Sequence, residues 1–346
     1  MRAMILKEFR QMRRDRRTLA LMVGLPLMML IIFGYAARFD IKEIDTAVIG
    51  PGAQEIAAAL PEVYLATEID PTGNRTDATE LLRNSEVGVA FVTSGTGAVM
   101  MIDGTELFVA QSALRRVPPG VAPEVLFNPN LDTAKVMVPA LIGLVLLFVG
   151  TVITSLGVVR EREQGTLEQL AVMPLRPIDV TVGKIAPYFL VATIDMVFVT
   201  LAGLYVFDVP FEGSFVMFAL FGLTFTFVVL GIGVAISTVS QSQGEAIQLA
   251  IMLMLPQIML SGMIFPLESM AGGVRWIGYL LPLTWFVIGS RSLLLKGTDP
   301  AALLLPLGIL ILMAIVVFGV AVIRFRRDLT PKQTEEALRT EPRVTA

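Results

Sequence analysis

Six long apolar runs restrict this chain to a membrane-spanning fold more than any other feature of its sequence. A helix needs ~20 mostly apolar residues, at ~1.5 Å per residue, to cross the hydrocarbon core of a bilayer. Charged residues make up 16% of the 346 residues, whereas soluble domains carry about 25%, and the mean hydropathy is +0.73. We therefore expect an α-helical polytopic membrane protein with six transmembrane helices. The apolar runs cover residues 18–37, 136–159, 185–207, 214–239, 246–265 and 301–323.

The distribution of Lys and Arg predicts the orientation of these helices, because cytoplasmic segments carry an excess of basic residues. Residues 1–17 contain seven basic and two acidic residues, and residues 324–346 contain six and four. Residues 38–135 contain seven basic and 14 acidic residues. Both termini, including the tail 324–346, are therefore expected in the cytoplasm and residues 38–135 outside. The run 18–37 lacks the small-x-small cleavage site of a signal peptide, so it is interpreted as a retained helix.

The segment 1–17 is predicted to form an amphipathic helix on the inner face of the membrane. Its apolar residues share one helical side, and arginines occupy much of the remainder. A basic flank that only sets the topology is the alternative. The apolar side consists of Ile5, Leu6, Phe9 and Met12.

A seventh apolar stretch, residues 274–295, is not interpreted as a span. A seventh crossing would place the basic residues after Arg324 outside, against the positive-inside rule. Pro282 interrupts the stretch, and Trp276 and Trp285 favour the membrane interface. We expect two short helices in a re-entrant segment, residues 266–297, that dips into the outer leaflet and returns. Asp299 is then expected to cap the last helix.

Residues 38–135 are predicted to form a small extracytoplasmic α/β domain. Strands are expected at 46–50, 63–69, 87–93 and 98–105, and helices at 53–60 and 77–86, the second capped by Thr76 or Asp77. The order β-α-β-α-β-β favours a mixed sheet with right-handed crossovers. Residues 115–130 are interpreted as an extended return to the membrane.

The composition excludes several kinds of chemistry. The chain contains no Cys and no His, so disulfides, thiolate metal sites and the commonest general base are absent. No G-x-x-x-x-G-K-[ST] loop occurs, so this chain alone is not expected to hydrolyse a nucleotide. We expect no catalytic residue, no metal site and no nucleic-acid partner.

Three polar residues fall within the apolar runs. Asp195 lies near the middle of the run 185–207, where a carboxylate is costly and faces a cavity or a partner. It is either a group that contacts substrate or protons, or a protonated carboxyl in one interhelical hydrogen bond. Gln248 and Gln257 are interpreted mainly as interhelical hydrogen-bonding residues. Gly231 and Gly233, with Ala235 and Ser237, are expected to allow close approach of another helix.

The stretch "VVREREQGTLEQLAVMPLRP", residues 158–177, separates two apolar runs on the expected cytoplasmic side. Leucines form one side of a short helix, charged residues form the other, and prolines end it. Connections between helices usually need few residues, whereas this one, residues 160–184, uses more than 20. We interpret it as a protein-docking surface, with an ordinary loop as the alternative.

At these residues the chain resembles the ABC type-2 exporter permeases. "REREQGTLEQLAVMPLRP" resembles the signature E-R-E-x-G-T-x-E-x-L-x-x-x-P of that family. "LPLMMLIIFGYA", "FNPN…VPALIGLVL" and "LPQIMLSGMIFPLESM…IGYLLPLTWF…RSLLLKG" resemble it in the same order. The large outer domain resembles the subgroup of multidrug or lipophile exporters. Met173 departs from the small Ser or Thr that is common there.

The resemblance implies six transmembrane helices of the type V ABC exporter kind, without an ATPase site of their own. Two permeases, identical or sister chains, would form the pore in a bacterial or archaeal cytoplasmic membrane. Each would dock on one of two ATP-binding subunits, which hold ATP and Mg. Residues 1–17 would be the connecting helix and residues 160–175 the coupling helix. The implied ATPase contacts are Glu161, Arg162, Glu163, Gly165, Thr166, Glu168 and Leu170.

The resemblance also implies that the re-entrant segment closes the outer end of the path. The expected substrate is an amphipathic drug-like or lipid-like molecule. Two alternatives are an ion-coupled secondary transporter that uses Asp195 and a membrane receptor that uses the outer domain. The candidate gate residues are Pro266, Trp276, Pro282, Trp285 and Arg291.

Overall fold

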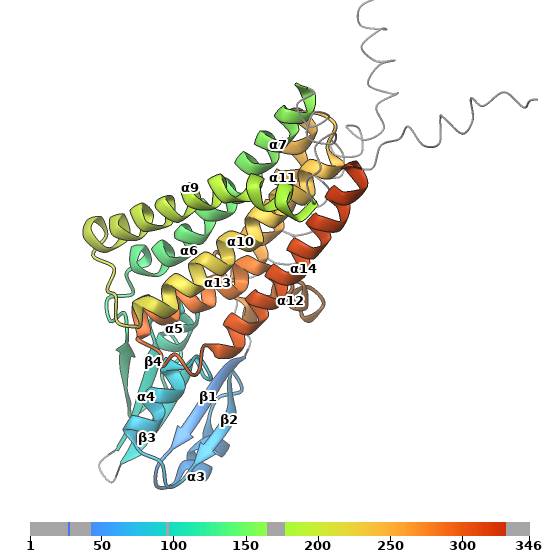
Figure 1. Cartoon of the computed structure of the whole chain (residues 1–346). Helices are drawn as coiled ribbons and strands as arrows, with labels where there is room; N and C mark the ends of the chain where they lie inside the picture. The colour runs from blue at the N-terminus through green and yellow to red at the C-terminus, as the bar shows by residue number, and fades with distance from the viewer. Residues whose placement is uncertain (1–26, 28–42, 95–96, 165–176, 330–346) are drawn as a thin grey trace, which may run out of the picture.

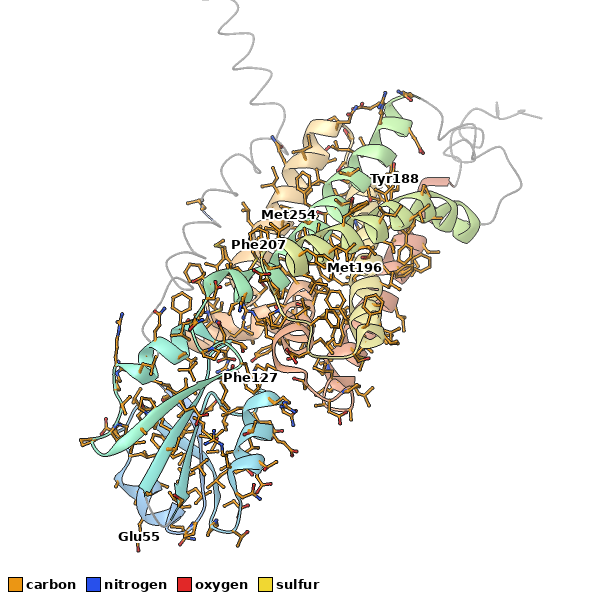
Figure 2. All side chains as sticks on the ribbon, turned by 90° about the vertical axis from the view of Figure 1, so that its left-hand side faces the viewer. Glu55, Phe127, Tyr188, Met196, Phe207 and Met254 are labelled. Atoms are coloured by element: carbon orange, nitrogen blue, oxygen red, sulfur yellow. The ribbon has the colours of Figure 1, made fainter. Side chains whose placement is uncertain are left out.

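The computed structural model describes residues 27, 43–94, 97–164 and 177–329. These residues form an α/β domain joined to a bundle of long helices (Figure 1). The expected helix 1–17, the first apolar run 18–37 and residues 330–346 lie outside the described part of the chain, apart from residue 27. Figure 2 places Phe127 at the junction of the two parts and Glu55 at the far end of the α/β domain.

The α/β domain contains a five-stranded mixed sheet with the strand order β2-β1-β3-β4-β5. Strand β1 pairs in parallel with both β2 and β3, β3 and β4 form an antiparallel pair, and β5 returns parallel to β4. In the register, Val48 lies opposite Phe91, and Val92 lies opposite Val99. The strands are β1 Ile44–Ile49, β2 Tyr64–Asp70, β3 Val89–Ser94, β4 Gly97–Asp103 and β5 Val121–Leu126.

Helices cover both faces of this sheet because the apolar side chains of its strands alternate between two cores. Helices α3 (Ala53–Ala59) and α5 (Leu107–Leu114) pack on the face that contains Phe91. Helix α4 (Arg75–Arg83) packs on the opposite face, which contains Met101. The expected mixed α/β domain is therefore present.

The order of elements in this domain corrects the sequence interpretation in two places. Strand β5 was not predicted, because residues 115–130 were interpreted as an extended return to the membrane, and helix α5, which precedes that segment, was not predicted either. Pro123 lies within β5, which is tolerated because β5 is an edge strand. The helix expected at 77–86 begins earlier, at Arg75. Asn74 caps it, and the Asp77 carboxylate accepts a hydrogen bond from the Asn74 backbone N–H at 2.7 Å.

Among the described residues, five helices are long and apolar enough to cross a membrane. They match the last five predicted runs, and the first predicted run lies outside the described residues. The corresponding segments are Thr133–Glu161, Ile185–Val206, Phe215–Val239, Gln243–Leu260 and Leu304–Arg324. The bundle elements are α6 Thr133–Phe148, π-helix η1 Val149–Ile153, α7 Thr154–Glu163, α9 Pro177–Val206, α10 Phe215–Val239, α11 Gln243–Leu260 and α14 Leu304–Leu329.

A side-chain cap marks the start of α10, whereas the cap predicted for the last helix lies before its observed start. Ser214 caps α10 by accepting a hydrogen bond from the Met217 backbone N–H at 3.4 Å. Asp299 accepts one from the Ala301 backbone N–H at 2.8 Å, but a turn follows and α14 begins only at Leu304. The predicted start of the last span at residue 301 was therefore too early.

Helix α10 lies at the centre of the bundle and packs very closely on the π-helix η1. A methyl group added at Gly233 would lie 2.3 Å from the carbonyl oxygen of Gly150, and one added at Gly150 would lie 2.3 Å from Val229. The predicted close approach at Gly233 is thus confirmed. The aromatic rings of Phe225 on α10 and Phe286 stack with their centroids 4.8 Å apart.

Helices α9 and α14 leave most of their apolar surface uncovered. In the most apolar 18-residue stretch of each helix, 22% of the residues are buried, compared with 67% in the span formed by α6, η1 and α7. Exposed apolar side chains along a long helix require lipid or another apolar helix as their surroundings.

Candidate functional site

Two short helices lie where the re-entrant segment was predicted. Helix α12 (Gly272–Tyr279) and helix α13 (Pro282–Arg291), extended by the π-helix η3 (Ser292–Lys296), are bent by 80° at the break between them. Pro282 occupies the first turn of α13, where its missing N–H costs no hydrogen bond. The residue thought to interrupt one helix therefore begins the second.

The aromatic gate residues differ in their surroundings. The indole N–H of Trp285 donates to the backbone oxygen of Tyr279 at 2.9 Å, across the bend, and the two rings lie 5.9 Å apart. Trp276 on α12 is 57% exposed. Trp285 thus holds α12 and α13 at their angle, whereas Trp276 remains available to lipid.

Arg291 and Pro266 connect this helix pair to the end of α11. The guanidinium of Arg291 donates through Nη2 to the backbone oxygen of Met263 at 3.3 Å. Pro266 follows Met263 in the segment between α11 and α12 and is half-buried. Both residues line one cavity, so the structure brings together two of the five predicted gate residues.

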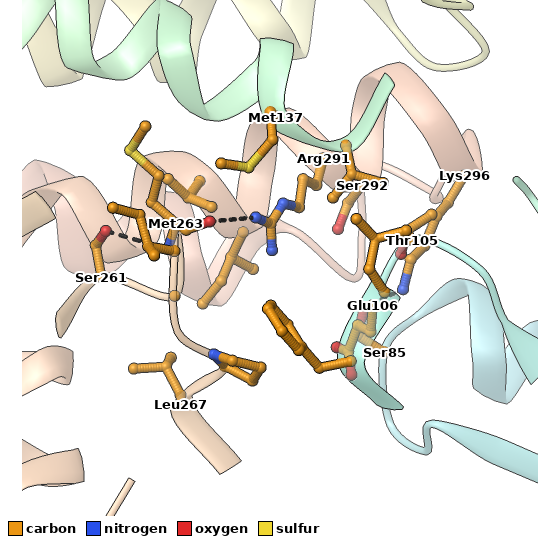
Figure 3. Close-up of a pocket in the computed structure, with 18 of the residues that line it drawn as sticks. Ser85, Thr105, Glu106, Met137, Ser261, Met263, Leu267, Arg291, Ser292 and Lys296 are labelled. Carbon is orange, nitrogen blue, oxygen red and sulfur yellow. Dashed lines mark hydrogen bonds between the residues drawn. The ribbon is translucent and has the colours of Figure 1, made fainter. Parts of the chain in front are cut away.

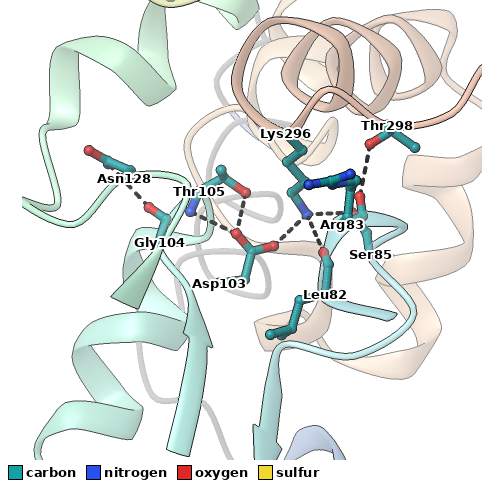
Figure 4. Close-up of polar contacts among 9 residues, drawn as sticks. All are labelled: Leu82, Arg83, Ser85, Asp103, Gly104, Thr105, Asn128, Lys296 and Thr298. Atoms are coloured by element: carbon teal, nitrogen blue, oxygen red, sulfur yellow. Dashed lines mark hydrogen bonds and ion pairs between the residues drawn. The ribbon is translucent and has the colours of Figure 1, made fainter. Parts of the chain in front are cut away.

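A buried ion pair connects the helix pair to the α/β domain (Figure 4). The ammonium of Lys296, at the end of η3, contacts the Asp103 carboxylate at the end of β4, with side-chain exposures of 2% and 1%. Lys296 also donates to Ser85 Oγ at 2.6 Å and to the backbone oxygen of Leu82 at 3.2 Å. The other Asp103 oxygen accepts from the backbone N–H and hydroxyl of Thr105, at 2.9 and 2.7 Å.

Two further contacts reinforce this junction. The Thr298 hydroxyl donates to the backbone oxygen of Arg83 at 2.8 Å, and the Lys296 ammonium lies 5.9 Å from the ring centroid of Phe127. Sequence reasoning missed all of these residues. The available signal was Lys296 itself, a lone charge after three leucines in a largely apolar segment.

Beside the ion pair, a cavity of about 480 Å³ opens between the α/β domain and the bundle (Figure 3). Its apolar wall comes from α6, α13 and the segment after α11. Its polar wall comes from η3 and the part of the domain next to it, whereas Leu107 and Phe108 of α5 add apolar side chains from the domain. The apolar wall includes Val136, Met137, Met263, Ile264, Val287 and Ile288, and the polar wall includes Ser85, Thr105, Glu106 and Lys296.

At the end of the bundle farthest from the α/β domain, the predicted coupling segment begins in α7. Glu163 ends α7 and accepts two hydrogen bonds from Gln243, the first residue of α11: one from the backbone N–H at 3.0 Å and one from the side-chain amide at 2.5 Å. These bonds hold the pKa of Glu163 below its ordinary value, the side-chain bond more than the backbone bond. Glu163 thus fixes the start of α11 to the end of α7.

The remaining predicted ATPase contacts are described only in part. Glu161 is half-buried on α7. Arg162 lies in the same helix, but its side chain is outside the described structure. Gly165, Thr166, Glu168 and Leu170 are also outside the described residues.

The three intramembrane polar residues do not converge on the cavity. Asp195 is half-buried on α9. Gln257 on α11 is 3% exposed, and neither its carbonyl oxygen nor that of Gln248 accepts a hydrogen bond from a described residue. Their role as interhelical hydrogen-bonding groups stays a prediction. The described residues contain no group of three acidic side chains placed to hold a metal ion.

Comparison with known proteins decides the family. Residues 16–323 match the profile of the family described as ABC-2 family transporter protein. The chain belongs to the ABC-2 transporter family. This ABC-2 protein is accordingly a multi-pass membrane protein, as its apolar helices require.

The ABC-2 chain is similar to three curated proteins of Escherichia coli strain K12. It is 27% identical to the probable multidrug ABC transporter permease YbhS, over 95% of this chain and 97% of YbhS. It is 28% identical to the probable multidrug ABC transporter permease YbhR, over 86% of this chain and 90% of YbhR. It is 34% identical to the inner membrane transport permease YhhJ, over 59% of this chain and 54% of YhhJ.

Proposed function

We propose that this chain is the permease subunit of an ATP-driven exporter that moves amphipathic, drug-like or lipid-like molecules out of the cell. The observation that carries the proposal is the extent of the similarity to YbhS, which covers 95% of this chain and 97% of that probable multidrug permease. The α/β domain and the bundle both fall within the shared region. The chain lies in the cytoplasmic, inner membrane, with both termini inside.

ATP is hydrolysed on a separate subunit in this proposal. The sequence lacks the Gly-rich loop and Lys that bind nucleotide phosphates, so two partner subunits hold ATP and Mg. Two permeases, identical or sister chains, form the path. The run 18–37 supplies the sixth span, and α12 and α13 form the re-entrant gate. The partly covered helices α9 and α14 support this arrangement, because they leave apolar surface for lipid and for a second permease.

The coupling segment 160–175 transmits the partner's movement. When nucleotide brings two ATPases together, the segments move with them and shift the permeases between inward-open and outward-open states. Glu163 extends this connection, because its hydrogen bonds to Gln243 join the segment to α11. Movement at α7 would therefore reach α11 and, at the other end of α11, the segment that lines the cavity.

Charge reversal in the coupling segment tests the docking assignment. The variant Glu161→Lys/Glu163→Lys is expected to lower ATP hydrolysis stimulated by substrate in the purified complex, while the chain still reaches the membrane. Glu55→Lys, at an exposed position on α3 of the α/β domain, reverses a charge away from the segment and serves as the control. Unchanged stimulation in the double variant would refute docking at this segment.

A further inference from the structure

We propose that the cavity between the α/β domain and the bundle binds uncharged amphipathic molecules of drug size as they leave the membrane. This inference rests on the proposed export function and adds a site and a chemical class to it. The site lies within one permease chain, between its α/β domain and its helices, rather than between two chains.

The size and lining of the cavity fit such a ligand. Ligand pockets usually have volumes of about 300–1,000 Å³ and mostly apolar walls with a few polar groups, and this cavity has about 480 Å³. Met137 and Met263 place thioethers on its apolar side. Thioether side chains adapt to ligands of different shape because they are flexible and polarisable.

The polar wall gives the ligand one preferred orientation. Ser85 and Thr105 lie on the side of the α/β domain, opposite the side chains of α6 and α13 (Figure 3). A molecule with one polar end would place that end toward Ser85 and Thr105 and its apolar body toward Met137 and Ile288. The polar end therefore faces the domain that is expected outside the cell.

The charges around the cavity favour a ligand without net charge. Arg291 and Lys296 contribute two positive charges to the lining, and Glu106 contributes one negative charge. Asp103, buried against Lys296, supplies the second negative charge. These charges sum to zero, so an added charged group would lose its hydration without meeting a net counter-charge, which is costly in a mainly apolar site.

Cysteine protection tests this site, because the chain contains no cysteine. Met137→Cys and Ile288→Cys place a thiol in the cavity at two half-buried positions. Gln54→Cys, at an exposed position on α3 of the α/β domain, is the control. Each variant is purified with its partner ATPase in lipid nanodiscs and is then alkylated with N-ethylmaleimide. Mass spectrometry of the peptide that contains the cysteine gives the rate of alkylation. The probes are Nile red, which is neutral, and rhodamine 6G, which is cationic.

Nile red is expected to slow alkylation at both cavity positions by about tenfold when present at about ten times its dissociation constant, since only the unoccupied fraction reacts. Rhodamine 6G should protect neither position, and neither dye should protect Gln54→Cys. Equal protection by the cationic dye would overturn the assigned class. Thiols that do not react without dye, or that Nile red leaves unprotected, would overturn the site.

The same preparation separates this inference from the proposed function. Reconstituted complex that exports Nile red with ATP, but whose cavity thiols are unprotected, would contradict the site alone. Protected thiols in a complex that does not export with ATP would contradict the export function and leave the binding site supported.

Discussion

Lys296 and Asp103 form an ion pair that is buried on both sides, although 193 residues separate them in the sequence. Lys296 ends the π-helix that follows α13, and Asp103 ends strand β4. The helix pair at the end of the bundle next to the α/β domain is thereby attached to that domain through charged groups that water does not reach. A movement of α13 must either carry the domain with it or break this pair.

Lys296→Met should destabilise the protein by about 3–5 kcal/mol, because it leaves the buried Asp103 carboxylate without its counter-charge. The melting temperature of the solubilised chain would fall accordingly. The double variant Lys296→Met/Asp103→Leu should recover much of the loss, since it removes both charges.

An exposed ion pair provides the control for this variant. Arg75 and Glu124 lie 2.5 Å apart with side-chain exposures of 54% and 39%, so Arg75→Met should cost no more than about 1 kcal/mol. Equal melting temperatures for Lys296→Met and Arg75→Met would contradict the structural role of the buried pair.

Gly233→Ala should destabilise the bundle by about 1–3 kcal/mol, because the added methyl group would overlap the Gly150 backbone and push α10 away from η1. Gly319→Ala on α14 is the matched control, because nothing lies within 4 Å of the added methyl group. Thermal unfolding of both variants in the same detergent measures the difference. A Gly233→Ala protein as stable as Gly319→Ala would refute the close contact.

The contact between Glu163 and Gln243 should depend on pH in a defined direction. Folding lowers the pKa of Glu163 through its two hydrogen bonds, so the stabilisation is complete above the ordinary glutamate pKa and is lost as the pH falls through the lowered value. The rate of backbone amide hydrogen exchange at the start of α11, corrected for the intrinsic effect of pH, should increase as the pH falls through that acidic range.

Two variants isolate this effect. Glu163→Ala should give fast exchange at the start of α11 at every pH and abolish the pH dependence. Gln164→Ala, which changes the exposed neighbouring residue, should behave as the unmodified chain. The hydrogen-bond assignment would be wrong if Glu163→Ala left the exchange of this peptide unchanged.

Asp195→Asn separates ATP-driven export from ion-coupled transport. Asp195 is half-buried on α9, and it does not line the cavity described above. We expect the variant to retain ATP-driven dye export with an unchanged pH profile. Weaker transport that no longer changes with pH would favour proton coupling through this carboxylate.

The helices of the bundle could be predicted because their signals are local. The span expected at 214–239 was found at Phe215–Val239, since an unbroken apolar run defines it without reference to other segments. The bend near Pro282 was predicted for the same reason. Strand β5 was missed because its partner β4 precedes it by a whole helix and Pro123 obscures its pattern.

The junction could not be predicted, because it depends on how distant segments are placed. A lone Lys296 in an apolar segment indicates a partner, but the sequence offers many carboxylates and does not select Asp103. The cavity is also a product of packing between α6, α13 and the domain. Glu163 was predicted as a contact to another protein, and its bond to Gln243 became visible only once α7 and α11 lay side by side.

The most direct test of the account is ATP-dependent transport by the purified chain and its partner ATPase in proteoliposomes. With ATP supplied on the side of the ATPase, Nile red should accumulate against its gradient on the other side, and a partner ATPase with its phosphate-binding Lys replaced should abolish this. Transport that proceeds without ATP and follows an imposed proton gradient would contradict the account.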